Sequence, residues 1–324
     1  MPEWREPLTE APQLAGRPQP TRRATYPTLD YEVDGRVARL TFNRPERGNT
    51  ITADTPRDLA HAVERADLDP AVHVILLSGR GKGFCGGYDL GIYAEQSFAE
   101  EGGAEPGTVV DPVVQAANHD PAGTWDPMLD YAMMSRFTKG FASLLHANKP
   151  TVVKLHGFCV AGGTDIALHA DQVIASDDCK IGYPPTRVWG VPSAGLWAHR
   201  LGDQRAKRLL LTGDCLSGKE AAEWGLAVES APADQLDERT EVLVQRIAQL
   251  PINQLMMIKL ALNSSLLASG VATSQLISTV FDGVSRHTRE GNAFQQRAAE
   301  VGFKLAVRER DEPFGDAGPS TYKG

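Results

Sequence analysis

Two glycine-centred segments decide the fold of this chain: FCGGYDL at residues 84–90 and GFCVAGGTD at residues 157–165. Each follows an apolar run rich in β-branched residues, VHVILL at 72–77 and PTVVKL at 150–155. Such a run followed by glycines predicts a strand, a tight turn and the start of a helix. The turn leaves backbone N–H groups without intrahelical partners, at the positive end of the helix dipole. Two such turns facing one point would stabilise a developing oxyanion.

Together these segments resemble the crotonase (enoyl-CoA hydratase/isomerase) superfamily. The first is similar to that family's F-C-A-G-x-D-L turn and the second to its N-G-x-x-x-G-G-G-x-E/D turn. The resemblance runs from about residue 26 into the C-terminal helices, and four more segments carry it: FNRPERGN at 42–49, IGYP at 181–184, LTGD at 211–214 and AAEWGL at 221–226. It implies an α/β fold with a crotonase-type ββα spiral core and a C-terminal helical region, assembled as a homotrimer or homohexamer.

Composition limits the classes of partner. The 324-residue chain is 42% hydrophobic and 23% charged, which is ordinary for a globular enzyme, and its net charge is −8. That charge argues against nucleic acid and against an anionic membrane surface. No apolar run has the length of a membrane span, and residues 1–23 lack the apolar core of a secretory signal. Cysteines 85, 159, 179 and 215 have no CxxC spacing, so we expect reduced thiols, no metal and a cytoplasmic location.

The pattern along the chain divides it into three parts. We expect a poorly ordered tail at 1–25, the spiral core at 26–235 with an insertion near 93–145, and a helical region at 236–324. An Asp34-Gly35 turn between alternating runs predicts a hairpin. Helical spacing predicts the following helices: 52–66, 128–145, 237–249, 253–268, 274–287 and 290–309. Residues 93–127 have few apolar anchors and are predicted to form a long loop.

The resemblance also assigns chemistry by position. The backbone N–H groups of Tyr88 and Gly162 correspond to the two oxyanion donors. Asp165 corresponds to one acid/base carboxylate, and the alternative is an aspartate that caps the helix. The family's second carboxylate falls on Pro185, which cannot transfer a proton. Ser193 stands where dienoyl-CoA isomerases and 4-chlorobenzoyl-CoA dehalogenases carry aspartate, so a carboxylate nucleophile is excluded there.

Binding positions follow in the same way. Tyr183 borders Pro185 and could donate a proton or position water; the alternative is a packed aromatic residue. The resemblance implies that CoA is held by Arg47, Gly48 and Gly86, with Lys259 near a CoA phosphate, although such cations are often only solvated surface charges. The sequence has no phosphate-binding loop and no dinucleotide fingerprint, so CoA would enter as part of the substrate thioester, with no separate cofactor.

The sequence therefore predicts an acyl-CoA enzyme that stabilises a thioester enolate, with enoyl-CoA hydratase as the leading activity. Because Pro185 replaces the second carboxylate, an enoyl-CoA isomerase, a decarboxylase or a C–C hydrolase of the same superfamily stays open. A non-catalytic acyl-CoA-binding subunit is the alternative from another class.

Overall fold

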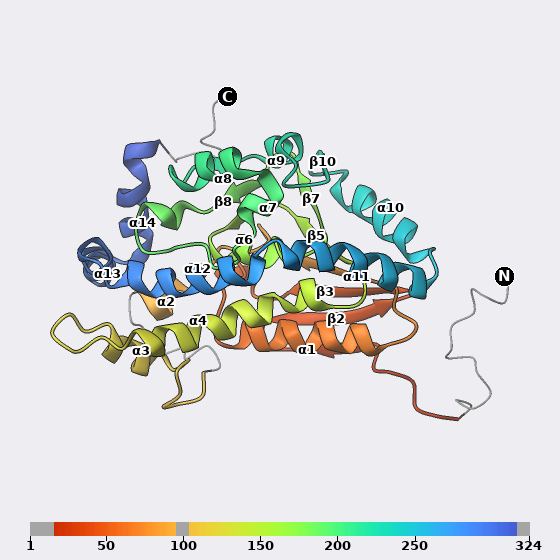
Figure 1. Ribbon diagram of the computed structural model, residues 1–324, viewed down its shortest axis with the longest axis horizontal. Helices are drawn as coiled ribbons and strands as arrows, with labels where there is room; N and C mark the ends of the chain where they lie inside the picture. The colour runs from red at the N-terminus through yellow and green to blue at the C-terminus, as the bar shows by residue number, and fades with distance from the viewer. Residues whose placement is uncertain (1–15, 95–103, 316–324) are drawn as a thin grey trace.

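A seven-stranded sheet runs through the computed structural model, which describes residues 16–94 and 104–315 (Figure 1). The strand order is β1-β2-β3-β4-β5-β7-β10, and a second sheet has the order β6-β8-β9. The strands are β1 Arg23–Thr25, β2 Leu29–Asp34, β3 Val37–Phe42, β4 Val74–Gly79, β5 Thr151–Leu155, β6 Phe158–Val160, β7 Gln172–Ser176, β8 Lys180–Gly182, β9 Cys215–Leu216 and β10 Glu229–Ala231. From β3 onward the large sheet is parallel, so the carboxyl ends of β4 and β5 lie at one edge.

The predicted hairpin is confirmed. Strands β2 and β3 pair antiparallel from Leu29 opposite Phe42 to Asp34 opposite Val37, and Gly35 in the turn has φ +56°. The N-terminal tail is predicted to extend to residue 25, but its last three residues, Arg23–Thr25, form strand β1 and pair with β2. Residues 1–15 of that tail lie outside the described residues.

Helices cover the sheet and extend the molecule along its long axis (Figure 1). Their bounds are α1 Asp54–Leu68, α2 Leu90–Tyr93, α3 Pro112–Asn118, α4 Pro127–Phe141, α5 Ser143–His146, α6 Gly162–Ala167, α7 Trp197–Leu201, α8 Asp203–Leu210, α9 Gly218–Trp224, α10 Leu236–Ala248, α11 Ile252–Ala268, α12 Val271–Arg286, α13 Arg289–Val301 and α14 Phe303–Asp311. Helix α4 packs against α1 on one side and α12 on the other. The main core lies between these helices and the sheet, with Phe84, Phe137 and Phe141 fully buried in it.

Two predicted helices are each divided in the structure. The segment predicted as 128–145 forms α4 and α5, which meet at Ala142. The segment predicted as 290–309 forms α13 and α14, because Gly302 between them has φ +83° and leaves the helical conformation. The predicted loop at 93–127 contains α3, whose first turn is capped by the Asp111 carboxylate.

The longest apolar segments are the helices α11 and α12. Among the described residues no single helix is long and apolar enough to span a membrane; α11 and α12 taken together, bent by 58° at their break, meet the criterion by length and composition only.

Candidate active site

The two glycine turns lie side by side because their backbones pair. Cys85 and Cys159 form a parallel bridge: the Cys85 N–H donates to the Phe158 carbonyl at 3.2 Å, and the Val160 N–H donates to the Cys85 carbonyl at 3.1 Å. Gly87 has φ +91°, and a Cβ there would stand 2.7 Å from the Ala161 Cβ. Only glycine permits this approach of the first turn to the second.

The approach leaves two backbone amides next to each other without acceptors. A Cβ on Gly87 would lie 3.3 Å from the Gly162 nitrogen, so the two turns are in van der Waals contact. The neighbours of Tyr88 are engaged, since Ile51 donates to the Gly87 carbonyl at 2.8 Å and accepts from the Asp89 N–H at 3.0 Å. Within the described residues, neither the Tyr88 nor the Gly162 N–H has a hydrogen-bond acceptor. Two unpaired donors at one place can hold an anionic oxygen.

A cavity of about 530 Å³ opens beside the first turn. Most of its wall is apolar or aromatic, including Met133, Phe137 and Trp189. Four residues that the sequence analysis singled out line it, namely Gly86, Tyr88, Tyr183 and Pro185. Helix α3 and its flanks in the insertion add further lining residues: Pro112, Gln115, Ala116 and His119. A pocket of this size and lining suits an acyl group.

The predicted CoA positions divide into two groups. The Gly86 N–H donates to the Gly48 carbonyl at 3.0 Å, and both residues pack near the Phe158 ring, which also lines the cavity. Arg47 is exposed beside Gly48. Lys259 lies elsewhere: its ammonium is buried, donates to the Leu144 and Lys149 carbonyls, and pairs with Asp171 at 2.8 Å. Lys259 therefore has no ammonium exposed for a phosphate, in contrast to the expectation from sequence.

Asp165 is buried and is not among the residues that line the cavity. Its side chain is fully buried, accepts from the Ala194 N–H at 3.0 Å, and accepts from the Ser193 hydroxyl at 3.3 Å. Burial raises the pKa of Asp165 to about 8, against the lowering effect of the Ala194 hydrogen bond. The carboxyl is thus held by the 193–194 loop, a contact that the sequence analysis did not foresee.

Two tyrosines near Asp165, Tyr88 and Tyr183, line the cavity. The Tyr183 hydroxyl donates to the Val191 carbonyl at 3.3 Å, and the Tyr88 ring packs edge-on against Phe137 at 5.5 Å. Burial, and after it the negative charge of Asp165, raises the pKa of both phenols well above the usual value. Both hydroxyls therefore remain protonated donors at neutral pH.

The turn that contains Pro185 carries no carboxylate. Pro184–Arg187 is a 3-10 turn, and Pro185, whose side chain cannot transfer a proton, lines the cavity. The Arg187 guanidinium turns away, pairing with Asp214 at 3.4 Å and Asp311 at 3.2 Å. It is therefore engaged within the protein and does not reach the acyl pocket.

The polar end of the cavity comes from α12, which the sequence analysis missed. Asp282 and Arg286 line the cavity and form an ion pair one helical turn apart. Asp282 also accepts from the Val191 N–H at 3.1 Å, and Arg286 donates to Asp130 at 2.9 Å. Burial raises the pKa of Asp282, while Arg286 opposes this shift. The available signal was an Asp and an Arg spaced i, i+4 in an otherwise uncharged helix.

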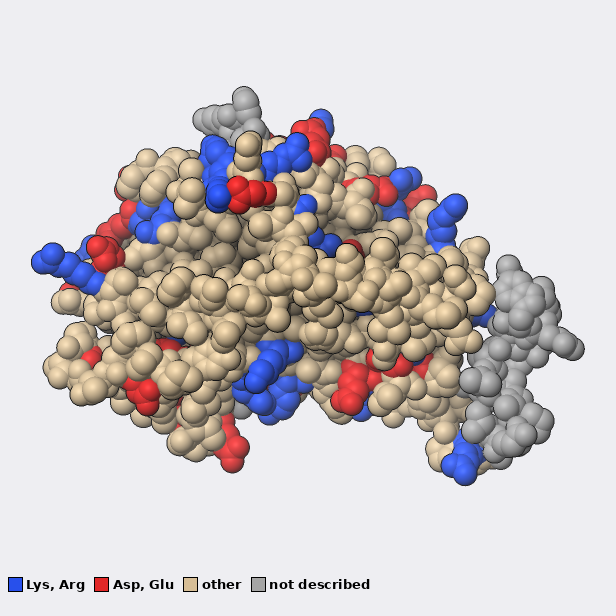
Figure 2. Space-filling view, viewed as in Figure 1, with Lys and Arg blue, Asp and Glu red and all other residues tan. Residues whose placement is uncertain are grey.

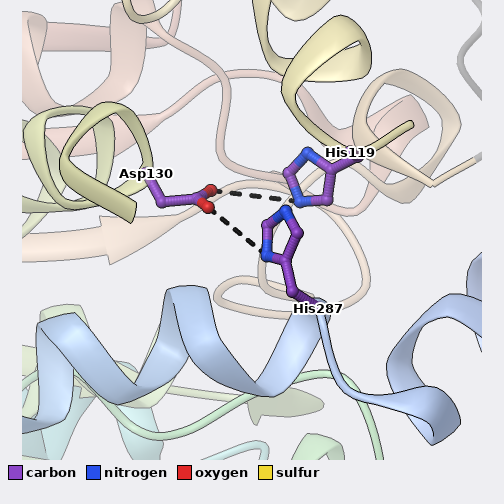
Figure 3. Close-up of side chains that lie close together, drawn as sticks. All are labelled: His119, Asp130 and His287. Atoms are coloured by element: carbon purple, nitrogen blue, oxygen red, sulfur yellow. Dashed lines mark ion pairs between the residues drawn. The ribbon is translucent and has the colours of Figure 1, made fainter. Parts of the chain in front are cut away.

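Beside this pair, His119, Asp130 and His287 lie close together (Figure 3). His119 is 3.9 Å and His287 is 3.4 Å from the Asp130 carboxylate. Such a trio resembles a metal-ligand set, but Arg286 donates to both Asp130 and the His119 Nε2. A cation would meet the guanidinium charge and compete for the same lone pairs, so the arrangement does not fit a metal. It fastens α3, α4 and α12 together through side-chain contacts.

Comparison with known proteins identifies the family of the chain. The family model for enoyl-CoA hydratase/isomerase matches residues 32–111 and 126–298. The crystal structure of an enoyl-CoA hydratase from Mycobacterium smegmatis is 65% identical, with a TM-score of 0.85, and the match covers 91% of this chain and 97% of that one. A probable enoyl-CoA hydratase from Rhizobium meliloti is 29% identical, covering 75% of this chain and 83% of that protein. The 1,2-epoxyphenylacetyl-CoA isomerase of Escherichia coli is also 29% identical, covering 72% and 80%.

The chain belongs to the enoyl-CoA hydratase/isomerase family and has the crotonase fold. It is accordingly a hydratase-like acyl-CoA enzyme. The family match omits residues 112–125, which fall inside the predicted insertion and include α3. Part of the cavity wall is therefore built from sequence outside the family match.

The raised pKa of Asp165 makes a prediction for stability. The folded state favours the protonated carboxyl, so its stabilising contribution is complete below the ordinary pKa of 3.8 and is lost as the pH rises toward about 8. Asp165→Asn stays neutral and can keep both hydrogen bonds. We expect the free energy of unfolding of Asp165→Asn, measured relative to that of the parent, to increase by up to about 1.4 kcal/mol per pH unit over this range. Urea unfolding at several pH values measures the gain, with exposed Asp234→Asn as the control. A pH-independent difference would contradict the assigned protonation.

Proposed function

We propose that this enzyme adds water across the Cα=Cβ bond of an enoyl-CoA thioester, and catalyses the reverse elimination. The observation that carries the proposal is the pair of unpartnered amides, Tyr88 and Gly162, beside a largely apolar cavity. As negative charge moves onto the thioester oxygen, both N–H groups can donate to it. One such donor contributes roughly 10²–10³-fold to the rate in comparable sites.

The substrate lies with its acyl group among the aromatic residues and its CoA portion toward Gly48, Gly86 and Phe158. Lys180 and Lys304 line the cavity and, in place of buried Lys259, are the cations we assign to CoA phosphates. CoA enters as part of the substrate thioester, and no separate cofactor takes part in the reaction.

Isomerisation of the double bond is the second candidate. It is favoured by Pro185, because moving a double bond requires a proton shuttle but no activated water. The Escherichia coli relative is named as an isomerase of an epoxyphenylacetyl-CoA, which supports acyl-CoA isomerisation as a reaction class for proteins of this similarity. Both reactions use the same oxyanion donors and differ in whether water enters the product.

Isotope labelling separates the two candidates. With a panel of 2-enoyl-CoA and 3-enoyl-CoA thioesters in H₂¹⁸O, we expect a hydroxyacyl-CoA that contains one labelled oxygen, because water is the nucleophile. Mass spectrometry of the product thioester reads this directly. A product that has the mass of the substrate and a displaced double bond would show that the reaction is isomerisation and not hydration. Tight binding without turnover of any thioester would leave a non-catalytic binding subunit.

The amide of Gly162 can be tested with a matched pair of substitutions. Gly162 is the first residue of α6, a position that accepts proline. Gly162→Pro removes the N–H, whereas Gly162→Ala adds a comparable Cβ near Ile51 and Tyr88 but retains the N–H. We expect kcat of the proline variant to fall about 10²–10³-fold below that of the alanine variant. Equal kcat values in two folded variants would remove Gly162 from the oxyanion site.

We also propose that the chain assembles as a homotrimer or homohexamer through α11 and α12. Large apolar side chains are exposed along these helices: Met257, Ile258, Leu260, Leu262, Leu276, Ile277, Val280 and Phe281. Figure 2 shows few charged side chains over the band where the two helices run. A contiguous apolar surface of this kind marks a protein interface.

Phe281→Asp tests this interface. Phe281 is 54% exposed in the single chain, so an aspartate is tolerated in the monomer but places an unpaired charge in an assembled interface. We expect light scattering to show a trimer or hexamer for the parent and a monomer for the variant. Exposed Lys207→Asp on α8 is the control and should leave the mass unchanged. A parent that is monomeric at micromolar concentration would refute the assembly.

A further inference from the structure

We propose that Asp282 is the carboxylate that exchanges protons with the substrate, supplied from α12 in place of the side chain missing at Pro185. The inference rests on the proposed function and adds to it the identity of its acid/base group. It assigns to the C-terminal helical region a catalytic residue of this chain.

The position of Asp282 supports this role. Its side chain lines the same cavity as Tyr88 and Pro185. Its carboxylate accepts from the Val191 N–H, and the adjoining Gly190 packs so closely on Pro185 that a Cβ on Gly190 would be 2.9 Å from the Pro185 Cβ. The segment that holds Asp282 thus abuts the position where family members place a carboxylate. Asp165, in contrast, is not part of the cavity lining.

The surroundings allow Asp282 to change its protonation state. Five groups on other elements and on α12 face it: Arg286 and, farther away, Asp130, Asp165, Tyr88 and Tyr183. Arg286 stabilises the carboxylate, and burial with the nearby aspartates stabilises the acid. Opposing effects of this kind bring a buried carboxyl toward the working pH of a general acid/base.

Arg286 is itself held in place. It donates to Asp282, to Asp130 at 2.9 Å and to the His119 Nε2 at 3.3 Å. His119 in turn contacts the Gln115 carbonyl at 2.7 Å through Nδ1. The insertion therefore fixes the guanidinium, and the guanidinium fixes the carboxylate that faces the substrate.

The proton balance of the step is complete without a co-reactant. The Asp282 carboxylate accepts a proton from water as the water oxygen bonds to Cβ. The π-electron pair of Cα=Cβ moves into the thioester enolate, whose oxygen is held by Tyr88 and Gly162. The enolate then collapses, and Asp282 returns the proton to Cα. The carboxylate is regenerated, and the product contains one added water.

Asp282→Asn is the direct test, made in the full-length chain with a thioester that the parent hydrates. We expect kcat to fall about 10²–10⁴-fold, with the dissociation constant of the saturated acyl-CoA nearly unchanged. In the parent, kcat/KM should decline at low pH as Asp282 is protonated, and this limb should be absent from the residual activity of the variant. Solvent deuterium exchange at Cα of the saturated thioester should be lost together with turnover.

Asp130→Asn is the matched control, because Asp130 pairs with the same guanidinium but does not line the cavity. It should lower stability and keep the acidic limb of the pH profile, moved to lower pH because the Asp130 charge no longer raises the pKa of Asp282. Equal losses and equal pH profiles in Asp130→Asn and Asp282→Asn would reduce Asp282 to a structural role. A parent that hydrates no thioester would overturn the proposed function instead, so the two failures are distinguishable.

Asp282→Glu keeps the test decisive should the asparagine variant not fold. It preserves the charge and the partner Arg286 but displaces the carboxylate by one methylene. A misplacement of this size should lower kcat by about tenfold or more while the acidic limb of the pH profile persists. An unchanged kcat in Asp282→Glu, or in a folded Asp282→Asn, would overturn the assignment.

Discussion

The parallel backbone pairing of Cys85 with Cys159 is the contact on which the site depends. It exists because β4 and β5 are neighbours in a parallel sheet, so the turns that follow them leave the same edge. The pairing brings the first turn against the second, and Gly87 makes the distance possible. This arrangement leaves the two amides unpartnered and places residues of both turns on the cavity wall. A larger residue at position 87 would push the two turns apart, and with them the Tyr88 and Gly162 amides, without altering a catalytic side chain directly.

A second constraint is the charge buried beneath α12. Arg286 lies among Asp282, Asp130 and His119, and removing one partner of such a buried pair typically costs about 3–5 kcal/mol. The network joins the insertion to the C-terminal region, two parts of the chain that are far apart in sequence. Helix α12 consequently has two faces: Asp282 and Arg286 point into the molecule, while Ile277 and Phe281 stay exposed. The catalytic and assembly proposals thus use opposite sides of one helix.

Local signals in the sequence were sufficient for much of the fold. The Asp34-Gly35 turn, the strands before each glycine segment and the amphipathic helices are set by neighbouring residues, and the structure has them. The Gly86 N–H also donates to the Gly48 carbonyl, so two positions that the family resemblance assigns to CoA lie next to each other. These features could be predicted because turn chemistry and hydrophobic periodicity act over a few residues.

Other features depend on contacts that a sequence does not display. Lys259 looked like a surface cation, but its ammonium is captured by two carbonyls and Asp171. The helix break at Gly302 required its positive φ, since an isolated glycine is also tolerated within helices. Asp282 could not be placed near Pro185 from sequence, because nearly a hundred residues separate them and only tertiary packing brings α12 to the pocket.

A crystal structure with a saturated acyl-CoA bound would test the central claim most directly. The quantity to measure is the distance from the thioester carbonyl oxygen to the Tyr88 and Gly162 nitrogens. The account predicts that both distances are about 2.7–3.1 Å, with the Asp282 carboxylate facing Cα and Cβ. A thioester oxygen that contacts solvent or another group, with both nitrogens beyond hydrogen-bonding distance, would contradict it.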